Sequence, residues 1–170
     1  IGGELKRDDF DVDLKGNGSS FLFKSASFIG PGQHLDQQIS LKHRGQSTTS
    51  QQQINNVGDT KSSATCNGRI LIEKEASKAS AALSNQNLSL GKGVTFNAKP
   101  ELEIYNDDVT CSHGATIGQL SDSELFYLAS RGIDPESAKT MMAKGFLSKA
   151  LDGPLAQESH QHFDQLFAVA

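Results

Sequence analysis

Two side chains that can bind metal ions, or act as a nucleophile and its base, lie two positions apart at Cys111 and His113. On a β-strand, residues i and i+2 point to the same face, so the thiol and the imidazole would be neighbours there. Such a pair suits a soft metal ion such as zinc, iron or copper(I), and it also suits a nucleophile with its general base. A cysteine that packs beside a hydrogen-bonded histidine has the same spacing. Two ligands do not complete a metal site, so the spacing leaves these interpretations open.

The other candidate residues predict structure rather than chemistry. We expect Cys66 to be a small packing residue, and we expect His34 and His43, which lie in polar stretches, to be solvated. Residues 46–53, QSTTSQQQ, have almost no apolar content, which favours a solvated strand or loop. The sequence GKG at residues 91–93 lacks the spacing of a phosphate-binding loop, and the chain contains no dinucleotide fingerprint, serine elbow or HExxH motif.

Composition narrows the class of protein. The chain has 170 residues with 16 Lys and Arg against 20 Asp and Glu, a net charge of −4, which argues against a nucleic-acid surface. The sequence contains no apolar run near the roughly 20 residues of a membrane-spanning helix. Two cysteines do not make a disulfide framework, and they fit a reducing compartment such as the cytoplasm.

The elements that must position Cys111 and His113 are predicted to be strands. Short period-two alternations of apolar residues, such as Val12 with Leu14 and Leu102 with Ile104, recur with turn sequences between them. We place turns at residues 16–18, 30–32, 67–68 and 91–93. Residues 74–87 are rich in Ala, Ser and Asn, which favours irregular strand and turn over helix. This pattern fits a sandwich, a barrel or a β-solenoid, and periodicity does not choose among them.

The last fifty residues are predicted to be helical. Residues 121–152 should form two helices joined around residues 132–135, because Ser121 and Glu124 spell a capping box and Gly132 is a natural helix stop. Asp134 and Pro135 then supply an N-cap and a first helical residue. We expect Gly153-Pro154 to end the second helix, before a last apolar segment that contains Leu155, Phe163, Leu166 and Phe167.

The sequence KPELEIYNDDVTCSHGATIGQL, followed by LFYLASRGI, strongly resembles the SufB/SufD family of iron–sulfur cluster assembly proteins. The resemblance extends upstream through QHLD at residues 33–36, DTKSS at 59–63, Asn67-Gly68 and NLSL at 87–90. It therefore covers most of the chain, and the Cys-Ser-His-Gly-Ala-Thr block is its most specific part.

Within the family, the chain resembles the SufD branch. SufB-like sequences carry Glu-His-Glu-Ala-Thr where this chain has SHGAT at residues 112–116, and they place a cluster-related cysteine near the position of Asn85. The resemblance implies a right-handed parallel β-helix, or solenoid, followed by a small α-helical domain. Residues 1–118 would belong to the β-helix and residues 119–170 to the helical domain. Because the family proteins are longer, we expect this chain to correspond to their C-terminal part.

The resemblance also implies site residues and partners. Cys111 and His113 match SufD positions implicated in cluster assembly at the interface with a SufB-like subunit, where a transient, shared iron–sulfur cluster would form. The helical domain would dock a SufC-like ATPase through Leu125, Phe126, Leu128, Arg131, Gly132 and Phe146. The implied function is that of a scaffold subunit without turnover of its own, in the cytoplasm or, in a photosynthetic eukaryote, the plastid stroma.

Two other functions remain open from the residues. One is a solenoid hydrolase or lyase, with Cys111 as the nucleophile and His113 as the base. Polysaccharide-active solenoids usually present carboxylates or basic residues along a groove, and this sequence shows no such cluster. The other is a purely structural homodimer that binds no metal.

Overall fold

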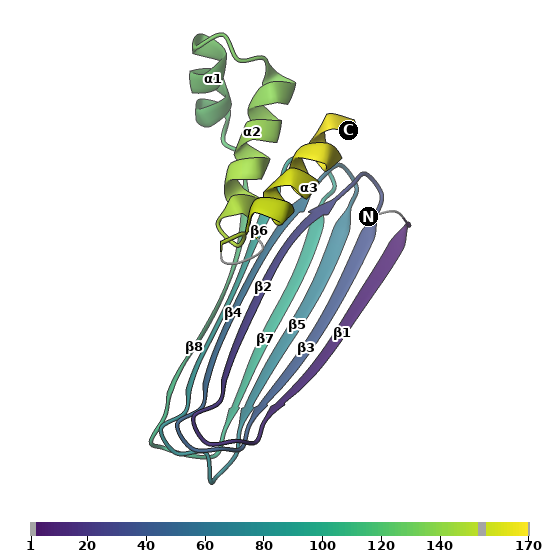
Figure 1. The fold of residues 1–170 in the computed structure, drawn as a ribbon. Coiled ribbons are helices and arrows are strands. Elements are labelled where there is room, and N and C mark those ends of the chain that lie inside the picture. Colours follow the sequence, from purple (N-terminus) through teal and green to yellow (C-terminus); the bar gives the residue numbers. More distant parts are fainter. Residues whose placement is uncertain (1–2, 153–155, 170) are drawn as a thin grey trace.

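The computed structural model describes residues 3–152 and 156–169, in which eight strands are followed by three helices (Figure 1). The strands, each ten residues long, are β1 (Leu5–Leu14), β2 (Ser20–Ile29), β3 (His34–His43), β4 (Thr49–Gly58), β5 (Ser63–Ile72), β6 (Ser80–Ser89), β7 (Thr95–Ile104) and β8 (Thr110–Gln119). The helices are α1 (Asp122–Ser130), α2 (Pro135–Ser148) and α3 (Ala156–Val169). The first helix therefore begins directly after the last strand.

The strands form two parallel sheets, with the orders β1-β3-β5-β7 and β2-β4-β6-β8. All their pairings are parallel, for example β3 with β5 and β6 with β8. Each turn of the chain adds one strand to each sheet, which gives a solenoid of about four turns. The predicted parallel β-solenoid with C-terminal helices is thus confirmed, and the sandwich and barrel alternatives, which need antiparallel pairing or closure, are excluded.

The loops between strands stack as regularly as the strands do. Gly18, Ser47 and Lys78 occupy equivalent positions in the loops of three successive solenoid turns, and their φ angles are positive, at 68°, 55° and 58°. Their backbone N–H groups donate to the carbonyl oxygens of Gln46, Ser77 and Asp108, each in the next turn of the solenoid. Ser47 and Lys78 accept an unfavourable left-handed conformation there, and the inter-turn hydrogen bond offsets part of its cost.

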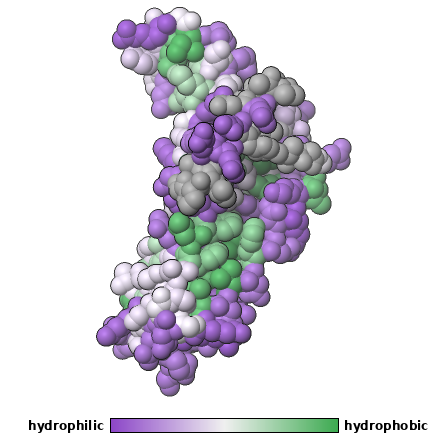
Figure 2. All heavy atoms as spheres, viewed as in Figure 1, coloured by the Kyte–Doolittle hydropathy of each residue, from purple (hydrophilic) through white to green (hydrophobic). Residues whose placement is uncertain are grey.

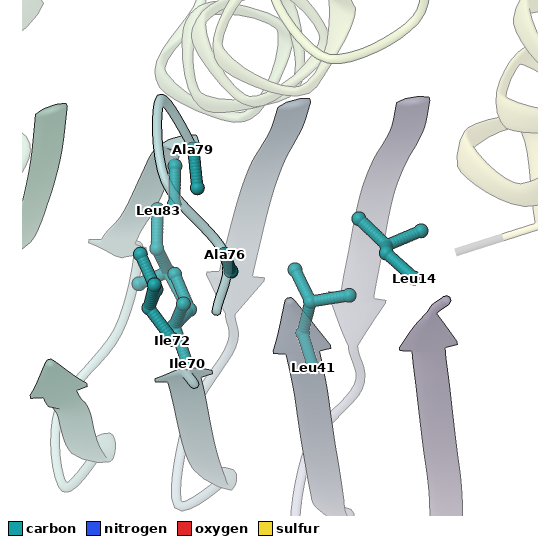
Figure 3. Close-up of a cluster of buried hydrophobic side chains, with 8 residues drawn as sticks. Leu14, Leu41, Ile70, Ile72, Ala76, Ala79 and Leu83 are labelled. Atoms are coloured by element: carbon teal, nitrogen blue, oxygen red, sulfur yellow. The ribbon is translucent and has the colours of Figure 1, made fainter. Parts of the chain in front are cut away.

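Inward-pointing apolar side chains hold the two sheets together. The largest buried cluster (Figure 3) combines side chains from both sheets and from the turn between β5 and β6, namely Leu14, Leu41, Ile70, Ile72, Ala76, Ala79, Ala81 and Leu83. Alternate residues of each strand face this interior, as the burial of every second residue in β3 and β5 shows. Burial between the sheets therefore follows the period-two pattern.

The interior also contains polar side chains, and this overturns two predictions. Residues 46–53 are not solvated throughout, because Thr48, Ser50 and Gln52 point inward and are buried. His43 is fully buried rather than solvated: its ring nitrogens Nδ1 and Nε2 lie 2.8 Å from Thr48 Oγ1 and 2.9 Å from Ser50 Oγ. Hydrogen bonding makes such burial tolerable, and burial lowers the pKa of His43.

The predicted turn at Asn67-Gly68 is also wrong, because both residues lie in the middle of β5. Asn67 points outward and its Nδ2 donates to Gln38 Oε1 at 2.9 Å. Gly68 points inward, where an added Cβ would lie 2.4 Å from Cδ1 of Leu83. The glycine is there for space between the sheets and not for a turn conformation.

The start and end of α1 and the start of α2 lie at the predicted residues. Ser121 caps α1 with the full capping box to Glu124, Gly132 follows the helix with a φ of 82°, and Asp134 caps α2 in front of Pro135. The predicted end of the second helix at residues 153–154 is wrong, because α2 already ends at Ser148 and residues 149–152 are not helical. Residues 153–154 themselves, like Leu155, lie outside the described residues. Among the helices that are described, none is both long enough and apolar enough to cross a membrane.

Candidate functional site

Cys111 and His113 lie on β8, the last strand of its sheet. The register pairs Cys111 with Ala81 and His113 with Leu83 of β6. Ala81 and Leu83 belong to the buried interior cluster, so both β8 residues continue inward-facing columns, while Ser112 faces outward. The spacing thus places the thiol and the imidazole on one face of the strand, as the sequence predicts.

The last turn of the solenoid leaves this inward face uncovered. In the described part of the chain, β7 and β8 each pair with one neighbouring strand only, so their other edges carry unpaired backbone groups. Cys111 is half-buried against the interior cluster, whereas His113 is exposed. Ile117 on the same strand is 61% exposed and Ile104 of β7 is 43% exposed. The side chains that would be core residues in a middle turn are surface residues here.

A shallow hollow lies between the two last strands. Phe96 and Ala98 of β7 and Ala115 and Ile117 of β8 line it, together with polar residues from the outer face. We call the inward positions of β7 and β8, with this hollow, the open edge. Sequence reasoning found Cys111 and His113 but missed Ile117 and Phe96. The period-two alternation of Cys111, His113, Ala115 and Ile117 was the available signal.

The two free thiols of the chain differ in burial, and burial raises the pKa of both. Cys66 is buried among Ile39 and Ile54, and burial, with a smaller contribution from Asp36, raises its pKa to about 11. Its predicted role as a small packing residue is confirmed. Burial also raises the pKa of the Cys111 thiol, partly opposed by a hydrogen bond to the Ala81 backbone. Cys111 is therefore mainly a neutral thiol, and a nearby cation or metal ion must stabilise its thiolate form.

The described residues do not bring together a set of metal ligands at this position. Within residues 3–152 and 156–169, there is no group of three or more His, Cys, Asp or Glu side chains that could hold a metal ion. Asn85, near which the resemblance implies a cysteine in SufB-like sequences, is buried and points inward from β6. Among the inward positions of β8, Cys111 and His113 supply one thiol and one imidazole.

The residues predicted for partner docking are divided between two surfaces. On α1, which has no buried residue, Phe126 is 76% exposed and Leu125 and Leu128 are half-buried. The Arg131 guanidinium lies over the Tyr127 ring at 5.4 Å from its centroid. Phe146, by contrast, lies on α2 and packs toward the solenoid. Sequence reasoning missed Tyr127, which is also exposed, and Figure 2 shows hydrophobic side chains at this helical end of the molecule.

The three helices α1 to α3, which we call the helical unit, are attached to the solenoid through α2. Ala143 and Leu147 of α2 pack on Val57 of β4 and Leu88 of β6, on the outer face of that sheet. Polar side chains of the solenoid hold the end of α2 and the residues after it. Asn55 Nδ2 donates to the Phe146 carbonyl at 2.9 Å, and Gln53 Nε2 donates to the Lys149 carbonyl at 2.7 Å. Lys24 pairs with Asp152, four residues beyond the helix. These amides satisfy carbonyls that a helix end otherwise leaves unpaired. The composition of the polar stretch gave no sign of this role.

A parallel β-solenoid with an open last turn and a helical unit on one sheet defines the class of protein. The family model described as "SUF system FeS cluster assembly, SufBD core domain" matches residues 1–146. The chain therefore belongs to the SufBD family of the SUF system for iron–sulfur cluster assembly.

Several curated proteins are similar to the chain. The iron–sulfur cluster assembly protein SufD of Escherichia coli is 34% identical over 149 residues, which covers 88% of this chain and 35% of that protein. A SufBD-family protein of Synechocystis is 32% identical over 159 residues, covering 92% and 35%. SufB of Bacillus subtilis is 30% identical over 134 residues, covering 79% and 29%. The chain spans about a third of the length of these relatives.

Proposed function

We propose that the chain is a non-catalytic, SufD-like scaffold subunit of the SUF assembly complex, which pairs with a SufB-like subunit and a SufC-like ATPase to build and deliver nascent iron–sulfur clusters. The observation that carries the proposal is the open edge, where Cys111 and His113 occupy inward positions of the last strand that no further strand of the described chain covers. The similarity to SufD of Escherichia coli supports the branch, and a thiol with an imidazole on one face of an edge strand supports a cluster shared with another chain.

The open edge suits a second solenoid as its partner. Unpaired strand edges and exposed apolar side chains are stabilised when another sheet covers them. Thiolate is the usual iron–sulfur ligand and imidazole can replace one, so each half of such an interface could supply part of a ligand set. In this proposal residues 1–118 form the pairing domain and residues 119–170 form the ATPase-docking domain.

The pairing is tested with charge substitutions on the two faces of β8. Ile117→Lys places a charge on the inward face of the open edge, whereas Ser112→Lys places the same charge on the outward face of the same strand. We expect Ile117→Lys to abolish co-purification with a SufB-like protein and Ser112→Lys to leave it intact. Equal binding by both variants, or a stable self-associated pair that excludes the SufB-like protein, would contradict the proposal and favour the structural homodimer.

The docking of the ATPase is tested on α1. Phe126→Asp replaces the most exposed aromatic side chain among the described helical residues, and Gln157→Asp adds the same charge at an exposed position of α3. We expect only Phe126→Asp to weaken binding of a SufC-like ATPase, while circular dichroism of both variants matches the parent. Unchanged ATPase binding by Phe126→Asp would remove α1 from the docking surface.

The observations give less support to the solenoid hydrolase. A nucleophile needs a thiolate, and burial raises the pKa of the Cys111 thiol.

The location of the protein is supported by one relative. The chloroplastic ABCI7 protein of Arabidopsis thaliana is 35% identical over 96 residues, which fits the plastid option beside a cytoplasmic location.

A further inference from the structure

Two adjacent asparagines of β4 connect the helical unit with the interior of the solenoid. Asn55 points outward, and its Nδ2 donates to the backbone carbonyl of Phe146 in α2 at 2.9 Å. Asn56 points inward, and its Nδ2 donates to Oδ1 of Asn87 in β6 at 3.1 Å. Both asparagines are fully buried. The last turn of α2 and the interior are thus joined through a single peptide unit of β4.

The inward branch continues to the open edge. Nδ2 of Asn87 donates to the backbone carbonyl of Thr116 in β8 at 3.1 Å. Thr116 directly precedes the exposed Ile117 and follows His113 by three residues. A continuous series therefore runs from the helical unit to the edge strand, through Phe146, Asn55, Asn56, Asn87 and Thr116. We call this set of contacts the asparagine series.

We infer that Asn55, Asn56 and Asn87 are positioning residues that couple the seating of α2 to the conformation of β8. The inference rests on the proposed function in one respect, namely that α1 and the open edge are taken as the two partner-binding surfaces. A partner that shifts α2 moves the acceptor of the Asn55 amide. Because Asn55 and Asn56 share a peptide unit, we expect the resulting displacement of Asn55 to change the Asn56–Asn87 bond and, with it, the support of β8.

Coupling requires a second arrangement of the series. The Oδ1 atoms of Asn55 and Asn56 are buried and have no hydrogen-bond partner within the part of the chain that the structure describes. An unpaired buried oxygen raises the free energy of the present arrangement. Joint rotation of the Asn56 and Asn87 amides would let Asn87 Nδ2 donate to Asn56 Oδ1 and would release the Thr116 carbonyl, so a second arrangement of the series frees β8 from this bond.

Gln53 provides a matched control on the same strand. Its Nε2 holds the Lys149 carbonyl at 2.7 Å, so it also fixes the last turn of α2. Its neighbours, however, are Ile54, which is apolar, and Gln52, whose amide atoms have no partner among the described residues. Loss of Gln53 should therefore free the chain at Lys149 while Asn55 still holds the Phe146 carbonyl, and the edge strand should be unaffected.

The test is hydrogen exchange of the protein alone, comparing residues 110–119 of β8 with residues 95–104 of β7. In Asn55→Ala we expect β8 to exchange about threefold to tenfold faster, the effect of one neutral hydrogen bond, while β7 is unchanged. In Gln53→Ala we expect only the residues next to Lys149 to exchange faster and β8 to be unchanged, because the Asn55 bond to Phe146 remains. In the double variant Asn55→Ala/Asn87→Ala, β8 should exchange no faster than in Asn87→Ala alone. By reciprocity, Asn87→Ala should also speed exchange in the last turn of α2, which it does not touch.

Three results would overturn the inference: equal changes of β8 in the Asn55 and Gln53 variants, faster exchange of β7 and β8 together, or additive effects of Asn55→Ala and Asn87→Ala. If Asn55→Ala does not fold, hydrogen exchange in the last turn of α2 is measured in Asn87→Ala instead. An unchanged exchange rate there rejects the coupling. Because no partner is present, failure of this test leaves the pairing and docking proposals standing, and their failure leaves the coupling standing.

Discussion

The inward positions of β6 and of β8 have the same geometry and opposite surroundings. Ala81 and Leu83 are buried between β4 and β8, whereas their register partners Cys111 and His113 have β6 on one side and an uncovered edge on the other. The difference teaches that an inward position of a solenoid is a core position only when turns cover it on both sides. In the last turn, the same position makes a thiol and an imidazole available to another molecule.

The largest expected difference between these regions concerns the column that contains Leu83 and His113. Leu83→Ala should lower the free energy of unfolding by about 2–4 kcal/mol, because it opens a cavity in a covered turn. His113→Ala, at the exposed end of the same column, should change it by less than about 0.5 kcal/mol. Urea unfolding followed by circular dichroism measures both. Similar losses in the two variants would mean that the last turn is covered in solution.

A matched pair of glycines sharpens the comparison. Gly68→Ala should cost about 1–3 kcal/mol, because its Cβ would lie 2.4 Å from the Leu83 side chain. Gly114→Ala in β8 meets nothing within 4 Å and should be nearly neutral. Combining Gly68→Ala with Leu83→Val should recover part of the lost stability, because it removes the clashing methyl group. Thermal unfolding of the three variants measures these effects, and a harmless Gly68→Ala would show that the sheets can separate freely.

The two regions should also respond differently to pH. Burial lowers the pKa of His43 below its ordinary value of 6.5, so below that pH the unfolded chain binds a proton that the folded chain does not. Above about pH 7 neither state binds this proton, so His43 does not change the free energy of unfolding there. Below pH 6.5 the free energy of unfolding falls as the pH drops, by at most about 1.4 kcal/mol per pH unit. Unfolding free energies at pH 7.5 and 5.5 should show a smaller loss in His43→Gln. His113→Gln, which leaves His43 in place, should retain the full loss, and an equal change in both variants would contradict the assignment.

The smallest expected effect is a gain. Neither amide atom of the buried Gln52 has a hydrogen-bond partner in the described residues, so Gln52→Leu should raise the free energy of unfolding by about 1 kcal/mol. The outward Gln51, which is exposed on the same strand, is the control, and Gln51→Leu should have no measurable effect. A loss of stability in Gln52→Leu would show that its amide is paired in solution.

Much of the fold could be predicted from the sequence, because local patterns encode it. Period-two alternation predicted the strands, and Ser121, Glu124, Gly132 and Asp134 predicted the helix ends, since these signals act within a few residues. The parallel solenoid itself came from the family resemblance. Composition misplaced His43 and the polar stretch beside it, because which face a residue presents depends on the whole register. That register is set by pairing with strands far away, as between His34 and Ser63, 29 residues apart.

The candidate site was only half predictable for the same reason. The spacing of Cys111 and His113 fixed their common face, and β8 has that geometry. Their exposure depends on the absence of a covering strand, which no local pattern encodes. The roles of Gln53 and Asn55 as partners of α2 depend on contacts across more than 90 residues of sequence, so composition recorded them only as polar.

The most direct test of the account measures iron in the assembled complex. The protein, His113→Ala, Cys111→Ser and the outward control Ser112→Ala are each combined with SufB-like and SufC-like partners, reconstituted anaerobically, and analysed for iron per complex, subunit stoichiometry and thermal stability. The account predicts that His113→Ala and Cys111→Ser lose most of the iron while keeping the stoichiometry and stability, and that Ser112→Ala behaves like the parent. Normal iron loading and normal maturation of a recipient protein with His113→Ala would contradict the claim that the open edge serves the cluster.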